Sequence, residues 1–298
     1  MSREPLVSIV VNCFNGERYL KEALTSVLDQ SYQNWEIIFW DNRSNDNSKN
    51  ILNSFKDKRI KYFFAEKHTT LYQARNLAIQ KSSGDLLAFI DADDLWEKNK
   101  LELQVPLFQD SKISLVYSNL WIAKENLEKK KLFIKKESPS GFIYEKLLDD
   151  YNVGIITTVF RKRIIKDIEK IFDERFSIIG DFDFFLKLSK SHYFHYINKP
   201  LAYYRIHKEN FSTIFKEKEM NEFDTWLSEN KKNIDSKKLN KISRKISLRK
   251  LLHFKFNADY KNCLIIFKKN FKSIIVFKML IIVFAPLYIL KKISWFHN

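Results

Sequence analysis

The sequence predicts an α/β fold with a mostly parallel sheet flanked by helices, followed by a helical and basic C-terminal extension. In residues 1–110, short apolar runs alternate with longer amphipathic stretches, the pattern of βαβ units. From residue 216 onward the pattern turns helical and rich in lysine. We therefore expect a domain over 1–215, divided into halves 1–110 and 111–215, and an extension over 216–298.

The first half contains four apolar runs that are short enough to be buried strands. They cover residues 6–11, 36–40, 60–65 and 85–90. Amphipathic stretches between them predict helices over 16–30, 48–56 and 71–82. Strands joined by helices at these spacings form a parallel sheet.

The second half is less regular. Strands are expected over 114–123 and 153–162, an exposed edge strand or loop over 129–136, and a helix over 181–190. Further along, the Lys- and Asn-rich stretch 229–245 is either a linker or a solvated helix.

The chain is strongly basic, with a formal net charge of +16 over 298 residues. Residues 231–272 hold fourteen Lys or Arg and two acids, a net charge of +12. Such a block suits an anionic membrane, nucleic acid or water alone. No zinc-finger, RNP-like or helix-turn-helix signature accompanies it, so we expect no nucleic acid as partner.

Cysteine and glycine usage narrows the class of protein and the kinds of site that the chain can form. Cys13 and Cys263 have no metal-binding spacing, and no secretory signal opens the chain, so a cytoplasmic protein is expected. The five glycines form neither GxGxxG nor a GxxxxGK[ST] loop. A nucleotide site would have to be built by other means.

Polar clusters follow three of the predicted strands. They cover residues 12–15, 41–46 and 91–94. Ligands of open α/β sheets bind outside the carboxyl ends of the strands. The three clusters are therefore expected to form one binding site.

Three carboxylates, Asp91, Asp93 and Asp94, end the fourth strand. Like charges so close together repel unless a cation or hydrogen-bond donors balance them. Mg²⁺ binds through one or two carboxylates together with substrate phosphates. The alternative for Asp94 is a helix cap, because Asp94 and Glu97 have capping-box spacing before a helical segment.

Several segments together resemble family 2 glycosyltransferases. Over residues 5–105 the resemblance is carried by VSIVVNCFNGERYL, EIIFWDNRSNDNS, ARNLAI, SSGDLLAFIDADDLW and KLELQ, which include the DxD pattern. FDERFSIIGDFDFFLKLS (172–189) is similar to the acceptor-side Glu-Asp motif of that family, and YYRIHKENFS (203–212) resembles its YRxH segment.

The resemblance implies a GT-A fold and an inverting transferase that uses a nucleotide diphosphate sugar, with a UDP-sugar favoured, and Mg²⁺ or Mn²⁺. It places Asn12 and Phe14 in the base pocket. Asp41, with Asn42, would hydrogen-bond the base, and Arg75 would lie near the diphosphate or sugar.

The resemblance also assigns a binding or catalytic role to each of the acidic residues. Asp91 would bind the nucleotide sugar, and Asp93 and Asp94 the metal, with His207 as a third metal or phosphate contact. Asp181 takes the place of the catalytic base, although Gly180 stands where the motif usually has Glu. A general base and a cation are what displacement at an anomeric carbon requires.

Each of these residues also has a structural alternative. Phe14 could be a core aromatic, Arg75 a solvated or salt-bridged side chain, and His207 a packed surface residue. Asp181 and Asp183 could instead cap a helix or complement its dipole.

The C-terminal stretch 279–290 is apolar and is flanked by Lys272, Lys278, Lys291 and Lys292. It is too short for a spanning helix, which needs about 20 residues. An interfacial helix drawn to anionic lipid is expected, with Trp295 and Phe296 as interfacial residues. The alternative is a helix that packs on the catalytic domain.

The expected function is transfer of a hexose or N-acetylhexosamine to a glycan or polyprenyl-linked acceptor in bacterial surface polysaccharide biosynthesis. The enzyme would be peripheral on the inner face of the plasma membrane. The alternatives are a sugar nucleotidyltransferase, which usually opens with a glycine-rich loop where this chain reads NCFNGERYL, and a nucleic-acid-binding protein.

Overall fold

The computed structural model describes residues 4–168, 171–270, 275–286 and 290. The chain falls into two compact units, Met1–Asn210 and Phe211–Asn298. This division lies close to the expected boundary between 215 and 216, and each unit is described by itself.

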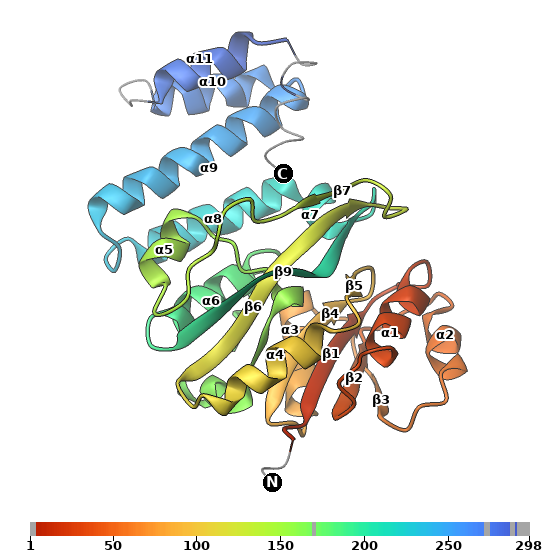
Figure 1. The fold of residues 1–298 in the computed structure, drawn as a ribbon. Helices are drawn as coiled ribbons and strands as arrows, with labels where there is room; N and C mark the ends of the chain where they lie inside the picture. Colours follow the sequence, from red (N-terminus) through yellow and green to blue (C-terminus); the bar gives the residue numbers. More distant parts are fainter. Residues whose placement is uncertain (1–3, 169–170, 271–274, 287–289, 291–298) are drawn as a thin grey trace. The chain divides into compact units, whose positions relative to one another are not determined.

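The first unit is built on one nine-stranded sheet (Figure 1). Its strands are β1 (Val7–Cys13), β2 (Trp35–Asp41), β3 (Ile60–Phe64), β4 (Leu86–Asp91), β5 (Leu95–Trp96), β6 (Ile113–Lys124), β7 (Lys130–Leu132), β8 (Val159–Arg161) and β9 (Tyr193–Ile206). The strand order is β3-β2-β1-β4-β8-β6-β9-β5, and β7 pairs with β6 at an edge.

Strands β1 to β4 form the predicted parallel half of the sheet. β1 pairs in parallel with β2 and β4, and β2 pairs in parallel with β3. Every residue of β1 and β2 is buried, as expected of a parallel sheet covered on both faces. β8 then joins β4 antiparallel and links the second half of the unit to the first.

Six α-helices and three 3-10 helices connect these strands in the described part of the first unit. They are α1 (Leu20–Leu28), α2 (Ser48–Ser54), α3 (Leu71–Gln80), α4 (Lys100–Gln104), η1 (Val105–Gln109), α5 (Tyr144–Asp149), η2 (Ile155–Thr157), η3 (Lys162–Asp167) and α6 (Gly180–Ser189). α1 buries Leu20, Ala23, Leu24 and Val27, the i, i+3, i+4, i+7 face of an amphipathic helix. Thr70 caps α3, since its side chain accepts a hydrogen bond from the Gln73 backbone N–H.

One prediction for the second half is wrong in part, and one long strand was missed. The strand expected over 153–162 is the 3-10 helix η2 followed by the three-residue strand β8. The long strand β9 was not predicted, and it runs beside β6 across the sheet (Figure 1). Pro200 within β9 lies where the β6–β9 register shifts, because proline cannot donate a ladder hydrogen bond.

The helix-cap alternative for Asp94 is also wrong. Leu95 and Trp96 form β5 against β9, and α4 begins only at Lys100 after the N-cap residue Asn99. Trp96 is 4% exposed, and its indole Nε1 donates to the Ile156 carbonyl at 2.9 Å. Burial of this large side chain and pairing with β9 outweigh the local helical pattern.

Glu36, near the amino end of β2, is a buried carboxylate with a full set of partners. It is 4% exposed, its Oε1 accepts from Ser8 Oγ at 2.6 Å and the Ser83 N–H at 2.7 Å, and Lys61 Nζ lies 2.5 Å from Oε2. Burial by itself would raise the pKa of Glu36, but the hydrogen bonds from Lys61, Ser8 and Ser83 outweigh it and hold the pKa at about 2. A carboxyl with a lowered pKa stabilises the fold above its unfolded pKa, and this stabilisation is lost as pH falls through the folded value.

We therefore expect Glu36→Gln to lower the free energy of unfolding by about 2–3 kcal/mol at pH 7. The difference from the wild-type chain should shrink as pH falls from about 5 towards 2. Urea denaturation at a series of pH values measures both effects. Glu66→Gln, at an exposed position, is the control and should change stability by less than about 0.5 kcal/mol. A constant difference between the wild-type chain and Glu36→Gln at all pH values would contradict the charge-based account.

The second unit is helical in its described residues. It contains α7 (Phe211–Ile214), α8 (Lys216–Asn230), α9 (Ser236–Phe256), α10 (Tyr260–Lys269) and α11 (Val276–Phe284). Leu251, Cys263, Ile275 and Met279 form a small core among α9, α10 and α11. The stretch 229–245 is mostly helix, since α9 begins after Asp235, whose carboxylate accepts from the backbone N–H groups of Lys237 and Lys238.

The predicted interfacial segment 279–290 falls partly in α11. Within the described ranges, the chain has no helix long and apolar enough to span a bilayer. Residues 287–289 of the segment, together with Lys272, Lys291, Lys292, Trp295 and Phe296, lie outside the described residues.

Candidate functional site

The carboxyl ends of β1, β2 and β4 lie side by side in the sheet. The register pairs Asn12 with Asp91 across β1 and β4, and Cys13 with Asp41 across β1 and β2. The polar clusters that follow these strands therefore meet at one edge of the sheet. This is the edge at which open parallel sheets bind ligands.

One end of this edge combines an exposed aromatic ring with a fixed carboxylate. Phe14 is 53% exposed, so it is not a core aromatic, and its ring centroid lies 4.4 Å from that of His68. Asp41 is 1% exposed and accepts hydrogen bonds from the Ser44 N–H at 2.7 Å and from Tyr62 Oη at 3.0 Å. A flat ring beside a preoriented carboxylate can receive a planar group that carries N–H donors.

Asn42 has a structural role beside Phe14 and Asp41. Its Nδ2 donates to the Thr69 carbonyl at 2.9 Å, and its Oδ1 accepts from the backbone N–H and Oγ1 of Thr69 at 3.1 and 3.0 Å. The Asn42 carbonyl lies 2.9 Å from His68 Nδ1. The Asn42 side chain thus holds the segment that carries His68 and Thr69, which leaves one amide hydrogen for a ligand.

Asn12 differs from Asn42 in having unused hydrogen-bonding groups. It is 9% exposed, and both its Oδ1 and Nδ2 are buried with no hydrogen-bond partner in the described part of the chain. An orphaned amide inside a protein is costly unless water or a ligand satisfies it. Asn12 can therefore contact a ligand at the end of β1.

Arg75 connects α3 to the end of β4. It is 2% exposed, and its guanidinium donates to Asp91 Oδ1 at 2.5 Å. The guanidinium also lies 5.3 Å from the ring centroid of Tyr72. Arg75 is thus a buried, salt-bridged side chain rather than a solvated one, and it gives this part of the site a fixed positive charge.

Asp93 is held by two residues that follow β9. His207 Nε2 lies 2.8 Å from Asp93 Oδ2, and Asn210 Nδ2 donates to the same oxygen at 3.3 Å. The Asp93 side chain is 31% exposed, whereas that of His207 is 6% exposed. His207 is therefore a buried partner of Asp93 and not a surface residue.

Asp94 is the most unusual carboxylate of the site. It is 1% exposed, its Oδ1 accepts from the Arg205 backbone N–H at 2.9 Å, and its Oδ2 has no partner among the described residues. Burial, followed by the negative charges of Asp93 and Asp91, raises the pKa of Asp94 well above its usual value. A bound cation would relieve both the burial penalty and the repulsion.

The residues present fit a hard divalent cation, because the donors are carboxylate oxygens and one of them is orphaned. Within the described ranges, no group of three or more Asp, Glu, His or Cys side chains could hold a metal ion by itself. A cation here would therefore need further ligands from a substrate or from water, as Mg²⁺ usually does.

Asp181 approaches the same region from α6. Its Oδ1 accepts a hydrogen bond from Tyr72 Oη at 3.0 Å, and Arg75 and Asp91 are close enough to act on its charge. Burial raises the pKa of Asp181, although Arg75 and Tyr72 act in the opposite direction. Asp183 is 3% exposed and lies 2.5 Å from Lys187 Nζ, one turn along the same helix. Neither aspartate caps α6, whose N-cap residue is Ile179, but both lie in its first turn.

Comparison with known proteins identifies the family to which this arrangement belongs. Residues 8–172 match the family model described as glycosyl transferase family 2. The chain belongs to this family. It is a glycosyltransferase, which sets aside a sugar nucleotidyltransferase as its function.

The glycosyltransferase is similar to WfgD of Escherichia coli, named as a UDP-Glc:alpha-D-GlcNAc-diphosphoundecaprenol beta-1,3-glucosyltransferase. The two are 33% identical over 184 residues, which cover 62% of this chain and 69% of WfgD.

Solved structures agree on the GT-A fold. TarS residues 1–349 of S. aureus, in complex with UDP-GlcNAc, match with a TM-score of 0.60 and 18% identity over 84% of this chain and 73% of that chain. The same fragment with UDP matches with a TM-score of 0.56 and 21% identity over 70% of this chain and 62% of that chain, less than two thirds of it. The mannosyltransferase PcManGT of Pyrobaculum calidifontis, with GDP-Man and Mn²⁺, matches with a TM-score of 0.58 and 13% identity over 81% of this chain and 68% of that chain.

The sequence analysis missed Arg205, which organises the acidic segment of the glycosyltransferase. Arg205 is 2% exposed. Its Nε donates to the Asp93 carbonyl at 2.9 Å, and its two terminal nitrogens donate to the Glu125 carbonyl and to Glu22 Oε2, each at 2.6 Å. The signal was present in the quoted segment YYRIHKENFS, where Arg205 stands two residues before His207.

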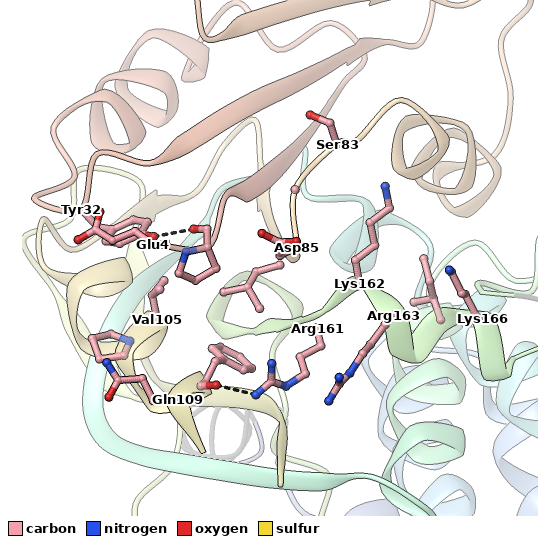
Figure 2. A pocket seen from close by; sticks show the side chains of 16 residues that line it. Glu4, Tyr32, Ser83, Asp85, Val105, Gln109, Arg161, Lys162, Arg163 and Lys166 are labelled. Atoms are coloured by element: carbon pink, nitrogen blue, oxygen red, sulfur yellow. Dashed lines mark hydrogen bonds between the residues drawn. The ribbon is translucent and has the colours of Figure 1, made fainter. Parts of the chain in front are cut away.

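A separate pocket of the glycosyltransferase, of about 780 Å³, lies away from this site. Figure 2 shows Tyr32 and Glu4 on one side of it and Arg161, Arg163 and Lys166 on the other. Its lining includes Pro5 and Gly84, which lie two residues before the first residues of β1 and β4. The pocket therefore opens at the amino ends of these strands, opposite to the acidic cluster.

Proposed function

We propose that this glycosyltransferase is an inverting enzyme that moves a hexosyl or N-acetylhexosaminyl group from a nucleoside diphosphate sugar to a hydroxyl of a glycan or lipid-linked glycan. The observation that carries the proposal is the connection between the donor-side and acceptor-side acids. Arg75 binds Asp91, and Tyr72 on the same helix binds Asp181. Two acidic segments far apart in sequence thus face one site.

The proposed reaction is a single displacement. The acceptor hydroxyl oxygen attacks the anomeric carbon, a new carbon–oxygen bond forms, and the bond from that carbon to the diphosphate oxygen breaks. The hydroxyl proton passes to the Asp181 carboxylate, and the electron pair of the broken bond leaves with the diphosphate. Attack opposite the leaving group inverts the anomeric configuration. A partly desolvated carboxylate with a raised pKa is well suited to take up this proton.

The donor pocket is assigned to the ends of β1 and β2. Phe14 would contact the face of the base, and Asp41 would accept a hydrogen bond from its N–H. Asn12 would form hydrogen bonds to the nucleotide with its unpartnered side-chain amide. Asn42 would act mainly by holding the His68–Thr69 segment. A UDP-sugar is favoured, in keeping with the UDP-GlcNAc and UDP bound to TarS and the UDP-Glc in the name of WfgD.

The proposed cofactor is Mg²⁺ or Mn²⁺, held by Asp93 and Asp94 together with the diphosphate. The orphaned oxygen of Asp94 supports this assignment, and PcManGT was solved with Mn²⁺. Such a cation neutralises charge that develops on a departing diphosphate. His207 would orient Asp93 or contact the metal or a phosphate, and Arg75 would orient Asp91 toward the nucleotide sugar.

The stereochemical course tests the proposed reaction. UDP-glucose and UDP-GlcNAc, which are α-linked donors, should be incubated with Mn²⁺ and a GlcNAc-diphosphate-prenyl acceptor. Proton NMR of the product should show a β-linked sugar, with release of one UDP for each sugar transferred. An α-linked product would mean retention and would overturn the inverting mechanism.

The proposed acceptor and location are supported by the name of one relative and by the surface of the second unit. WfgD is named for a diphosphoundecaprenol acceptor, which supports a polyprenyl-linked acceptor in bacterial surface polysaccharide biosynthesis. We assign the enzyme to the cytoplasm, peripheral on the inner face of the plasma membrane, where such acceptors are anchored.

The second unit has a surface that suits an anionic membrane. On α11, Phe277, Ile281 and Phe284 are 76%, 61% and 78% exposed, whereas Met279 on the opposite face is fully buried. On α10, Leu264 and Ile265 are each 53% exposed. Lys261, Lys268, Lys269 and Lys278 belong to the same two helices. Exposed apolar side chains beside lysines are the signature of an interfacial helix on anionic lipid.

Replacing Phe277, Ile281 and Phe284 with serine should lower binding to phosphatidylglycerol-containing vesicles by at least roughly tenfold, because three apolar side chains no longer leave water on binding. Co-sedimentation measures this, and raised salt should weaken binding of the wild-type chain. Phe142→Ser, at a 64% exposed position of the first unit, is the control and should bind normally. If the triple variant binds as tightly as the control, the membrane assignment is wrong.

A further inference from the structure

Gly180 directly precedes the proposed base Asp181, and the structure leaves no room for a side chain there. A Cβ atom at Gly180 would lie 2.6 Å from Tyr72 Cδ2 and 2.7 Å from both Cε2 and Cγ of the same ring. These separations are far below a van der Waals contact between carbon atoms, which is near 3.5–4.0 Å. The ring of Tyr72 therefore occupies the space into which any residue other than glycine would project.

Tyr72 cannot easily move to make that room. It is 2% exposed, and its ring packs against Phe172 with centroids 5.3 Å apart. Its hydroxyl also lies 2.7 Å from the Ile178 carbonyl, a second acceptor for the same hydrogen. One of the close atoms is Cγ, which lies on the axis of the Cβ–Cγ bond, so turning the ring about that bond would not relieve the contact. The absence of a side chain at Gly180 and the position of the Tyr72 ring are therefore sterically complementary.

The same tyrosine reaches the carboxylate that Gly180 precedes. Tyr72 Oη lies 3.0 Å from Asp181 Oδ1, which leaves Asp181 Oδ2 with no side-chain donor among the described residues. The ionisable groups that act on Asp181 from the elements around it are Tyr72 and Arg75 of α3 and Asp91 at the end of β4. Tyr151, in the segment before η2, also senses the charge of Asp181.

We propose that Tyr72 is the positioning residue of the base Asp181, and that it occupies the space left by the absence of the glutamate usual at position 180. The inference rests on the proposed role of Asp181. Tyr72 donates to the Asp181 carboxylate when this group is ionised. After Oδ2 of Asp181 has taken the acceptor proton, Oδ1 can still accept the hydrogen bond from Tyr72 Oη. The carboxyl group is thus held in one orientation before and after proton transfer, with Oδ2 toward the acceptor.

A titration of Asp181 tests the contact without any substrate. In the full chain with ¹³C-labelled aspartate, the Asp181 carboxyl signal is identified by its loss in Asp181→Asn. In Tyr72→Phe its titration midpoint should move to higher pH, since the ionised form loses a donor. Tyr117→Phe is the matched control, because Tyr117 is fully buried and its hydroxyl also binds a backbone carbonyl, that of Pro139 at 2.6 Å. An unchanged midpoint in Tyr72→Phe overturns the proposal.

A pair of variants tests the steric match. Gly180→Ala should lower the melting temperature strongly in the wild-type chain and much less in a Tyr72→Ala background, where the ring is absent. Equal losses in both backgrounds would show that the ring does not exclude a side chain at position 180.

Turnover measurements distinguish failure of the proposed role of Tyr72 from failure of the proposed role of Asp181. With UDP-glucose or UDP-GlcNAc as donor, Tyr72→Phe should lower kcat roughly tenfold with little change in donor KM. If Asp181→Asn keeps full turnover while the titration midpoint still moves in Tyr72→Phe, the base is elsewhere but the contact stands. If Asp181→Asn is inactive while the midpoint does not move, the base stands and the positioning role of Tyr72 falls.

Discussion

Replacing Asp181 with asparagine should lower turnover by roughly 10²–10⁴-fold, the usual contribution of a general base. Asparagine keeps the shape of the side chain and can still accept the hydrogen bond from Tyr72 Oη, so the fold and donor binding should be unchanged. Sugar transfer and nucleotide binding, measured on the same preparation, separate the two effects. Asp85→Asn, an exposed aspartate at the opposite edge of the sheet, serves as the control and should be fully active.

Unchanged turnover in Asp181→Asn would place the base elsewhere. Asp183 is a poor substitute, because it is 3% exposed and lies 2.5 Å from Lys187 Nζ. Its carboxylate is thus engaged within α6 and is not open to an acceptor. This contact gives Asp181 the stronger claim of the two aspartates in the first turn of the helix.

Replacing Asp94 with asparagine should abolish transfer, with a loss of at least roughly 10³-fold, because the departing diphosphate loses its cation. Asp93→Ala and addition of excess chelator should have the same effect. In contrast, Asp94→Asn measured in chelator should melt at the same temperature as the wild-type chain or higher. The variant removes a buried charge that Asp93 and Asp91 repel, and its amide oxygen can still accept from the Arg205 N–H.

Transfer assays and thermal melts, each with and without Mn²⁺, measure the two effects together. A variant that is inactive yet no less stable would identify Asp94 as a functional rather than a structural residue. Full activity of the wild-type chain in excess chelator would show that this enzyme works without a metal.

The parallel half of the fold could be predicted because its signals are local. The apolar runs 6–11 and 36–40 became β1 and β2, each buried along its whole length, and the register of parallel strands then brings Asn12 beside Asp91. The helix expected over 71–82 became α3, since the Thr70 cap and the apolar spacing agree. Where local pattern and tertiary packing point the same way, sequence reasoning succeeds.

The second half could not be predicted to the same degree, because long-range pairing decides it. β9 carries the mixed polar and apolar sequence YFHYINKPLAYYRI, and it becomes a strand through pairing with β6. The helix expected directly after Asp94 begins only at Lys100, because Leu95 and Trp96 pair with β9 and Trp96 is buried against a distant part of the chain. No sequence period encodes either partner.

The candidate site also has features that could be predicted from the sequence and features that could not. The strand-end acids could be predicted from their positions after the fourth strand, and Asp181 from the family resemblance, but the contacts that connect them could not. Arg205 holds the Asp93–Asp94 segment from more than a hundred residues away, and Tyr72 meets Gly180 and Asp181 across a similar separation. Such contacts are properties of the packed fold, and only the structure reveals that the unusual glycine at position 180 has a partner.

The most direct test of the account is a thermal-shift screen of the intact chain against nucleoside diphosphate sugars with Mn²⁺ present. Binding at a hundred times Kd stabilises the folded state by about 2.7 kcal/mol, so one donor should raise the melting temperature by roughly 5 °C or more. The shift should fall in chelator and in Asp41→Ala, the residue proposed to bind the base. The absence of a shift with every nucleoside diphosphate sugar would contradict the proposed donor site at the ends of β1, β2 and β4.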